Sequence, residues 1–235
     1  MTRPFDREGL LALPTLELGA SLLGWRLVRD DADGRRVARI VELEAYIGED
    51  DIASHARFGR TARNAVMYGP KGRAYVYLVY GMHDCLNIVT EPIGSPAALL
   101  VRAVEPLAGV ELMRASRAGR AAARRRAPDV AAVADSVVAS PSVSDHRLAA
   151  GPGLVCAVFD LDRSLTGHDL FAPEASVRIE PPPADEPAPV VIAGPRVGIG
   201  YAGPPWTEVP WRLAIAANPA VSRPPVEAAR GRLPG

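Results

Sequence analysis

The feature that most constrains the fold is the stretch of residues 25–47, WRLVRDDADGRRVARIVELEAYI, in which two β-rich runs flank the polar turn DDADG. Two such runs around a short polar turn are typical of a β-hairpin. A second stretch of this kind, RAYVYLVYGMHDCLNIVTE (73–91), predicts another hairpin that turns near Gly81. The strand predicted at AALLVRAVEP (97–106) is more apolar, as expected of a central strand.

Three segments predict helices. Leucines at helical spacing in LPTLELGASLLG (13–24), followed by Gly24, indicate a first helix that ends at a glycine. Residues 48–59 predict a short helix capped by Asp50 or Asp51 and ended by Gly59. A basic helix is expected over 111–126, ELMRASRAGRAAARRR.

The second half of the chain contains two loop-like segments. Residues 127–146 are rich in Ala, Ser and Val and predict a mobile surface loop. The proline-rich segment 181–189 predicts a surface loop rather than a domain boundary, because RVGIGYAG (196–203) and PWRLAIA (210–216) beyond it resemble strands that need a sheet to join. We therefore expect one domain over residues 1–235.

Charge and composition exclude several classes of protein. The formal net charge is +0, which argues against a strongly basic nucleic-acid binder but permits a local basic face. Two cysteines are too few for a disulfide framework and fit a reducing cytoplasm, and the Arg-, Ala- and Pro-rich composition indicates a bacterial source. No apolar stretch reaches the length of a membrane span. Glu49, Asp50, Asp51 and His55 do not match a zinc signature, so neither a metal nor another cofactor is expected.

The run RIVELEAYI places acidic side chains along one strand. Strict alternation would put Val41, Leu43 and Ala45 on one face, and Glu42 and Glu44 on the other, together with Ile40 and Tyr46. Carboxylates beside a phenol are an arrangement that acid–base chemistry uses. The alternative interpretation is a solvated outer face, although Tyr46 is too apolar for a purely wet surface.

Half of the six tyrosines lie in residues 75–80, next to the predicted turn. Strand alternation places Tyr75 and Tyr77 on the same face, where a core role is the simplest interpretation for Tyr75. Tyr80 adjoins the turn and is expected to be exposed together with Met82. An exposed pair of this kind could act as a wedge that unstacks DNA bases, while Tyr77 stacks on the displaced base.

A longer set of ordered sequence blocks resembles the alkyladenine (3-methyladenine) DNA glycosylase family. The similarity extends over nearly the whole chain apart from the 127–146 segment and both tails, and its blocks are RIVELEAYIGEDDIASHARFGRTARN, GRAYVYLVYGMHDCLNIVT, LLVRAVEPLAG, GPGLVCAVFDLDRSLTGHDL, GPRVGIGYAG and PWRLAIAANPAVS. The resemblance implies an α+β fold, with a single mixed domain, a curved antiparallel β-sheet, surrounding helices and a protruding β-hairpin. It also implies hydrolysis of the N-glycosidic bond of alkylated or deaminated purines in base excision repair.

The resemblance also implies roles for individual residues. Glu44 corresponds to the general base that activates water, and Arg102 to the arginine that helps to place that water and contacts backbone phosphate. Asn87 corresponds to the residue that discriminates against normal guanine. The remaining implied residues are Tyr46, His55 and Tyr77, which sandwich the flipped base, and Tyr80 with Met82, which fill the gap left in the duplex.

General chemistry agrees with these roles. A base must leave the duplex before an enzyme can reach it, and a carboxylate can both activate water and stabilise the positive charge that develops on the sugar. Because no amine nucleophile is implied, and the only lysine, Lys71, is not one, we expect a monofunctional glycosylase. We expect Arg60 to contribute to a local DNA-backbone patch, with helix arginines 114, 117 and 120 as further candidates.

Some positions depart from the family pattern. Ala62 replaces a common proline, and Leu154 and Ala157 stand where the family often has a basic residue and a glutamine, which puts the strength of a phosphate contact in doubt. Two other functions compete. A non-catalytic binder of damaged DNA would not need Glu44, and a hydrolase of free nucleosides would not need the Tyr80 wedge. The expected partner is double-stranded DNA containing damaged purines, bound by a monomer in the nucleoid region of the cytoplasm, with no membrane association.

Overall fold

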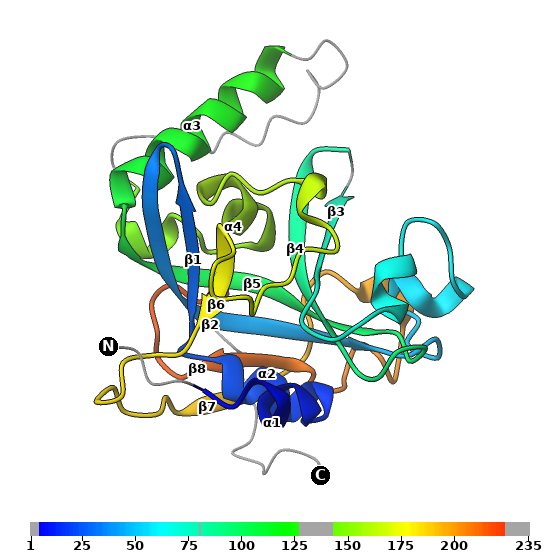
Figure 1. Ribbon diagram of the computed structural model, residues 1–235. Coiled ribbons are helices and arrows are strands. Elements are labelled where there is room, and N and C mark those ends of the chain that lie inside the picture. The colour runs from blue at the N-terminus through cyan, green and yellow to red at the C-terminus, as the bar shows by residue number, and fades with distance from the viewer. Residues whose placement is uncertain (1–4, 80, 127–142, 224–235) are drawn as a thin grey trace.

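The structure, a computed structural model, describes residues 5–79, 81–126 and 143–223 (Figure 1). Its central element is an eight-stranded antiparallel sheet that does not close on itself. Six strands run in the order β3-β4-β5-β2-β1-β6, and β8 pairs with both β2 and β7. The strands are β1 (Arg26–Asp31), β2 (Gly34–Ile47), β3 (Ala74–Val79), β4 (His83–Thr90), β5 (Ala97–Ala108), β6 (Val177–Glu180), β7 (Val191–Gly194) and β8 (Arg212–Ile215).

Helices pack around this sheet, which confirms the α+β fold class. In Figure 1, α1 and α2 lie together below the long strand β2, and α3 extends from the end of β5 above the sheet. The helices are α1 (Arg7–Ala12), α2 (Thr15–Leu22), α3 (Val110–Arg126) and α4 (Pro152–Val158), with short 3₁₀ turns η1 (His55–Phe58), η2 (Ala65–Tyr68), η3 (Asp145–Arg147), η4 (Arg163–Leu165) and η5 (Gly200–Ala202).

Both predicted hairpins are present. β1 and β2 pair from Arg26–Arg39 to Asp31–Gly34, and β3 and β4 pair up to Val79–His83, where the Met82 N–H donates to the Val79 carbonyl at 2.9 Å. The β3–β4 hairpin stands above the plane of β2 in Figure 1. Strand β5 is central, as its apolar sequence predicted, since it lies between β4 and β2.

A β-bulge interrupts the alternation of β2 beside the acidic residues. Ile40 pairs with Val104 and Glu42 pairs with Ala103, so Val41 is the extra residue. Val41 therefore packs with Ala103 in a small second cluster, whereas Ile40 and Leu43 join the main core. The prediction that Val41 shares the face of Leu43 is wrong, because a bulge adds a residue and re-aims the side chains around it.

Two other predictions are wrong. Residues 196–203 are not a strand: Gly198 and Gly203 have φ values of 80° and 64°, and the chain turns through η5 instead. Within 48–59, only η1 is helical, and its cap is Ser54, whose hydroxyl accepts from the Ala56 N–H at 3.1 Å. Of the predicted 127–146 loop, residues 127–142 lie outside the described residues.

Candidate active site

Glu44 lies at the centre of the sheet and is completely buried. Its Oε1 accepts from the Val197 N–H at 2.7 Å, and its Oε2 accepts from the Tyr46 hydroxyl at 3.0 Å and from Arg102 Nη1 at 3.4 Å. Burial raises the pKa of Glu44, while the charge of Arg102 and the hydrogen bond from Val197 oppose that shift. A raised pKa brings a carboxylate closer to the range that suits a general base.

A second buried carboxylate, Glu42, lies behind this group. Arg212 Nε donates to Glu42 Oε1 at 2.6 Å, and the Ser222 N–H donates to Glu42 Oε2 at 2.7 Å. Arg102 links the two acids, because its Nε lies 3.3 Å from Glu42 while its Nη1 reaches Glu44. Two carboxylates and two guanidiniums thus balance one another within the sheet. The interpretation of this strand face as a solvated surface is wrong, because both glutamates are buried.

Tyr46 rests on a buried ion pair that the sequence did not indicate. Arg196 Nη1 and Nη2 donate to the two carboxylate oxygens of Asp51 at 2.6 and 2.9 Å, and both side chains are fully buried. The Arg196 guanidinium lies 4.7 Å from the centre of the Tyr46 ring and 5.0 Å from that of Trp211. Asp51 is therefore an ion-pair partner and not the helix cap that was predicted. Burial also raises the pKa of Tyr46, so the phenol stays protonated and can donate to Glu44.

An aromatic group lines the same cleft and recess as Tyr46. The His55 and Tyr77 rings lie 4.3 Å apart, and the Tyr75 hydroxyl is 2.9 Å from His55 Nδ1. Burial lowers the pKa of His55 to about 4, and the nearby charge of Arg63 adds to that effect. His55 is therefore neutral at pH 7. Tyr75, predicted as a core residue, is buried behind the other two rings.

These side chains line a cleft of about 620 Å³. Tyr46, His55, Tyr77 and Arg102 all face it, and Leu154 lies on its far wall. A small recess of about 20 Å³ continues inward from Tyr46, His55 and Tyr77 to Asn87. Asn87 is buried and donates to the Tyr75 carbonyl at 3.0 Å, which fixes its amide at the floor of the recess. Glu44 does not line the cleft; it lies directly beneath Tyr46, Arg102 and Val197, which do.

The remaining predicted residues lie around the cleft. Met82 is half-buried at the tip of the β3–β4 hairpin, and Tyr80 lies outside the described residues. Arg60 is exposed, with its guanidinium 5.9 Å from the centre of the Tyr68 ring. The wedge and the backbone contact therefore stay predictions.

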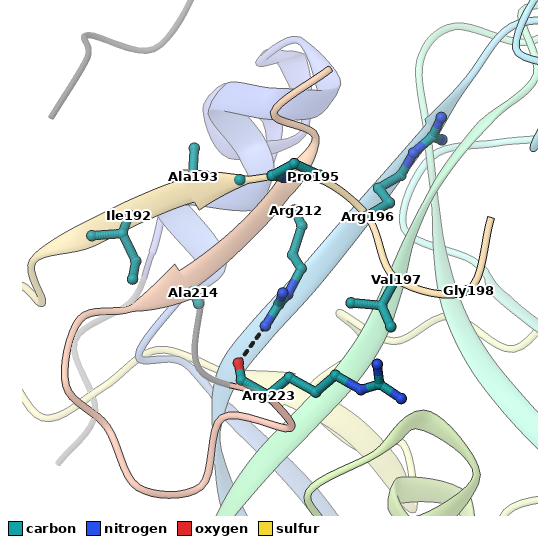
Figure 2. Close-up of a pocket in the computed structure, with 10 residues that line it drawn as sticks. Ile192, Ala193, Pro195, Arg196, Val197, Gly198, Arg212, Ala214 and Arg223 are labelled. Carbon is teal, nitrogen blue, oxygen red and sulfur yellow. Dashed lines mark hydrogen bonds between the residues drawn. The ribbon is translucent and has the colours of Figure 1, made fainter. Parts of the chain in front are cut away.

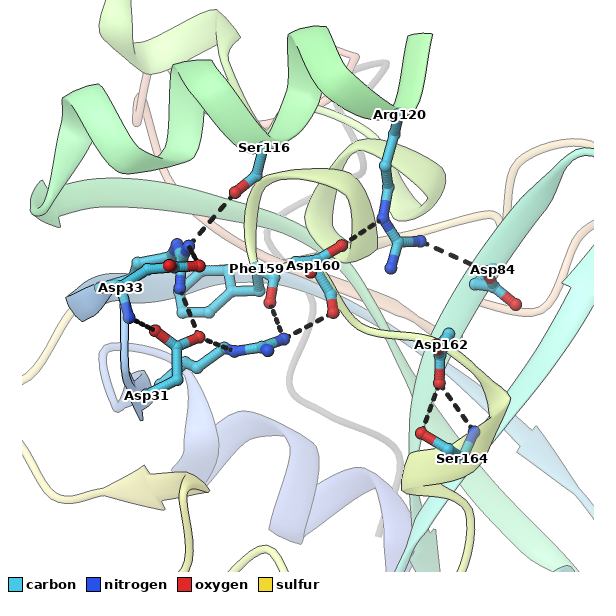
Figure 3. Close-up of polar contacts among 11 residues, drawn as sticks. Asp31, Asp33, Asp84, Ser116, Arg120, Phe159, Asp160, Asp162 and Ser164 are labelled. Carbon is cyan, nitrogen blue, oxygen red and sulfur yellow. Dashed lines mark hydrogen bonds and ion pairs between the residues drawn. The ribbon is translucent and has the colours of Figure 1, made fainter. Parts of the chain in front are cut away.

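Three arginines of the basic helix α3 contact other parts of the protein. Arg120 donates to Asp160 at 2.8 Å and approaches Asp84 of β4 at 3.4 Å, so it bridges α3, the end of α4 and the hairpin (Figure 3). Arg117 is buried and donates to the Leu148 carbonyl at 2.7 Å, and Arg114 pairs with Asp145. All three guanidiniums are engaged within the protein, so phosphate binding by these arginines stays a prediction that their contacts do not favour.

A second hollow, of about 320 Å³, lies on the other side of Val197 and Gly198 (Figure 2). Arg212 crosses it to donate to the Arg223 carbonyl at 2.5 Å, and Arg196 points away from it. Arg212 is already paired with Glu42, and Arg196 with Asp51, so neither guanidinium is free to bind an anion in this hollow.

Within the described ranges, no group of three or more His, Cys, Asp and Glu side chains could hold a metal ion. A helix long and apolar enough to cross a membrane is likewise absent from those residues.

Comparison with known proteins gives a consistent result. The family described as methylpurine-DNA glycosylase (MPG) matches residues 10–219. A Methanocella arvoryzae protein described as a candidate 3-methyladenine DNA glycosylase is 43% identical over 210 residues, which cover 89% of this chain and 92% of that protein. The DNA-3-methyladenine glycosylase of Mus musculus is 40% identical over 227 residues, covering 93% of this chain and 63% of the mouse protein.

Proposed function

Because the chain belongs to the methylpurine-DNA glycosylase family, and is thus a DNA glycosylase of base excision repair, we propose that it removes alkylated or deaminated purines. We propose that the reaction is a monofunctional, metal-independent hydrolysis in which Glu44 is the general base. The observation that carries this proposal is the position of Glu44. It is a buried carboxylate held by Val197, Tyr46 and Arg102, all three of which line the cleft.

The hydrogen bonds of Glu44 leave it able to act on water. A carboxylate offers about four acceptor sites, and three donors occupy Glu44 in this structure, so one site remains for a water that enters from the cleft. In the proposed reaction the ionised Glu44 takes a proton from that water as the water attacks the sugar carbon. The same charge stabilises the cationic sugar that develops as the base departs.

The aromatic side chains would hold the base outside the duplex. Tyr46 would lie on one face of the flipped purine, with His55 and Tyr77 on the other. Purines alkylated at N3 or N7 are cationic, and an electron-rich tyrosine face attracts a cation more strongly when water is excluded. A neutral His55 suits this role, because an imidazolium would repel such a base. Asn87, at the floor of the recess, would crowd the exocyclic amine of normal guanine.

The hairpin would open the duplex. We propose that Tyr80 and Met82 fill the space left by the flipped nucleotide, while Arg60 and Arg102 contact the DNA backbone. A base that pairs poorly leaves the stack at a lower cost, which favours damaged purines. We further propose that the protein acts as a monomer on nucleoid DNA in the bacterial cytoplasm, consistent with Cys85 and Cys156 being free thiols.

The test is a single-turnover base-release assay on duplexes that each carry one lesion: 3-methyladenine, 7-methylguanine, hypoxanthine or ethenoadenine. The wild type should release at least one base, and Glu44→Gln should bind the same duplex without releasing it. Glu174→Gln, which changes an exposed glutamate, is the matched control. Release by Glu44→Gln at the wild-type rate would exclude Glu44 as the base, and a wild type that binds lesions without release would support the non-catalytic alternative.

Two treatments test the rest of the proposal. Activity should survive EDTA, and the product should be an intact abasic strand. Trapping of a covalent protein–DNA adduct by borohydride would show an amine nucleophile and contradict the monofunctional mechanism.

A further inference from the structure

A separate hollow of about 380 Å³ adjoins the catalytic cleft, and we call it the rim pocket. Its wall includes Ser54, Arg57, Phe58, Thr61, Arg63 and Tyr201. Arg63 and Tyr201 also line the cleft, so the two spaces are neighbours that share a boundary. His55 lines both spaces as well, but the family-derived roles described above give no part to Arg57, Phe58 or Tyr201.

The rim pocket presents aromatic rings to solvent. Phe58 is 77% exposed and Tyr201 is 63% exposed. The Arg57 guanidinium lies between them, 4.5 Å from the centre of the Phe58 ring and 5.3 Å from that of Tyr201. Exposed aromatic rings interleaved with a guanidinium form the kind of surface on which nucleobases stack, whatever their sequence.

The loop that carries Phe58 is fixed in place. The buried Asn64 side chain donates to the His55 carbonyl at 2.9 Å and to the Gly59 carbonyl at 3.0 Å, and its Oδ1 accepts from the Thr61 N–H at 2.7 Å. Gly59 has a φ of 74°, which favours glycine and lets the chain turn directly after Phe58. Solvent exposure of Phe58 is therefore a feature of a preorganised loop, which reduces the entropy lost on binding.

The opposite wall is fixed as well. The Tyr201 hydroxyl donates to the Ala53 carbonyl at 3.2 Å, which orients its ring. Arg57 Nη1 donates to the Ile52 carbonyl at 2.5 Å, so the guanidinium stays between the two rings. Both walls are thus in position before any ligand arrives.

The charge of the rim pocket is positive. Arg57, Arg60 and Arg63 all come from this loop, and none of the ion pairs found within the described residues involves them. Arg57 and Arg63 each donate to a backbone carbonyl, of Ile52 at 2.5 Å and of Leu78 at 3.1 Å, whereas Arg114 and Arg120 of α3 are paired with carboxylates. Guanidiniums that have no carboxylate partner among the described residues, beside open aromatic rings, match a ligand that joins a flat ring to a phosphate.

We propose that the rim pocket binds an unpaired nucleobase of the substrate DNA next to the lesion, with the base stacked on Phe58 or Tyr201 and its phosphate near Arg57 and Arg63. This inference rests on the proposed function, because extrusion of one purine leaves the opposite base without a partner and takes a stacking neighbour from each adjacent base. The shared chemistry is a nucleobase with its phosphate, and its source is either a neighbour on the damaged strand or the base opposite the lesion.

The test uses a duplex with a tetrahydrofuran abasic analogue, which the enzyme cannot process further. Phe58→Ala should weaken its binding by about 5- to 150-fold, which corresponds to about 1–3 kcal/mol for one stacked base. Base release at saturating enzyme should stay at the wild-type rate, since Phe58 does not line the catalytic cleft. Phe58→Trp, which keeps a stacking ring, should restore affinity, and Val190→Ala, at a 71% exposed site on the loop before β7, should bind like the wild type.

Fluorescence identifies the source of the base. 2-Aminopurine is placed in turn at the 5′ neighbour, the 3′ neighbour and opposite the analogue. One of the three probes should be quenched on binding to the wild type and not on binding to Phe58→Ala. The proposal is overturned if Phe58→Ala binds with wild-type affinity, if Val190→Ala loses as much, or if no probe responds to Phe58.

The outcomes separate this inference from the proposed function. If the wild type releases bases but Phe58→Ala binds normally, the rim pocket proposal fails alone. If the wild type releases no base while Phe58→Ala still loses affinity and probe quenching, the proposed catalysis fails and the rim pocket stands.

Discussion

Replacing Asp51 by Asn should destabilise the protein more than any change at an exposed acidic residue. The substitution keeps the shape of the side chain but removes the charge that balances Arg196, and both side chains are fully buried. An arginine cannot release its proton to escape the penalty. Removal of one partner of a buried ion pair costs about 3–5 kcal/mol, because the other charge stays buried without compensation.

The expected loss can be measured by urea and thermal unfolding. At about 2–4 °C per kcal/mol for a chain of this size, the Tm should fall by about 6–20 °C. Asp50→Asn, at the exposed neighbouring position, is the control and should change the free energy of unfolding by less than about 0.5 kcal/mol. Base release should also slow in the folded fraction of Asp51→Asn, because Arg196 packs against the Tyr46 ring.

A double variant tests the cause of the loss. Arg196→Met with Asp51→Asn removes both charges and should recover part of the stability that Asp51→Asn loses alone. The reasoning is refuted if Asp51→Asn lowers the free energy of unfolding by less than about 1 kcal/mol. It is also refuted if the double variant loses the sum of the free energies that Asp51→Asn and Arg196→Met each lose alone.

Other changes should separate catalysis, pH dependence and folding. Glu42→Gln should keep lesion binding but slow base release and shift the acid limb of the pH–rate profile, because the substitution alters the ion pair that Arg102 shares with Glu44. An unchanged pH–rate profile would contradict this. His55 has a pKa of about 4 in the folded protein against 6.5 unfolded, so its contribution to stability is present above pH 6.5 and is lost as pH falls toward 4; the slope of unfolding free energy over this range should flatten in His55→Gln. Arg120→Gln should lower Tm and leave the salt dependence of DNA binding unchanged, since its guanidinium faces Asp84 and Asp160; a flatter salt slope would return this residue to the DNA surface.

The sequence predicted what local patterns determine. The hairpins formed by β1–β2 and β3–β4 follow from β-rich runs around polar or glycine-containing turns, and both are present. The central place of β5 follows from its apolar composition. The aromatic residues and Glu44 were found by their pattern and by family resemblance, and the fold brings Tyr46, His55 and Tyr77 to one cleft.

The missed features depend on distant contacts. Asp51 meets Arg196 across 145 positions, and Glu42 meets Ser222 across 180, so no local window contains either pair. The bulge at Val41 depends on how β5 pairs with β2, and a single strand cannot reveal it. A buried glutamate also has the sequence pattern of a solvated one. One signal of burial was available in the sequence, because Tyr46 follows the two glutamates and is too apolar for a fully solvated strand face.

Glu42 and Glu44 accept hydrogen bonds from residues of the C-terminal part of the chain, and this has a consequence for synthesis on the ribosome. Tyr46 and Arg102 contact these acids from the first half of the chain, but Glu42 also accepts from Arg212 and Ser222, and Glu44 also accepts from Val197. During translation, the early hairpins can pair while these two carboxylates still lack their donors from the C-terminal part of the chain. The hydrogen bonds of the proposed catalytic centre are thus complete only after residue 222 has been added, and a chain interrupted before residue 197 would lack the Val197 donor to Glu44.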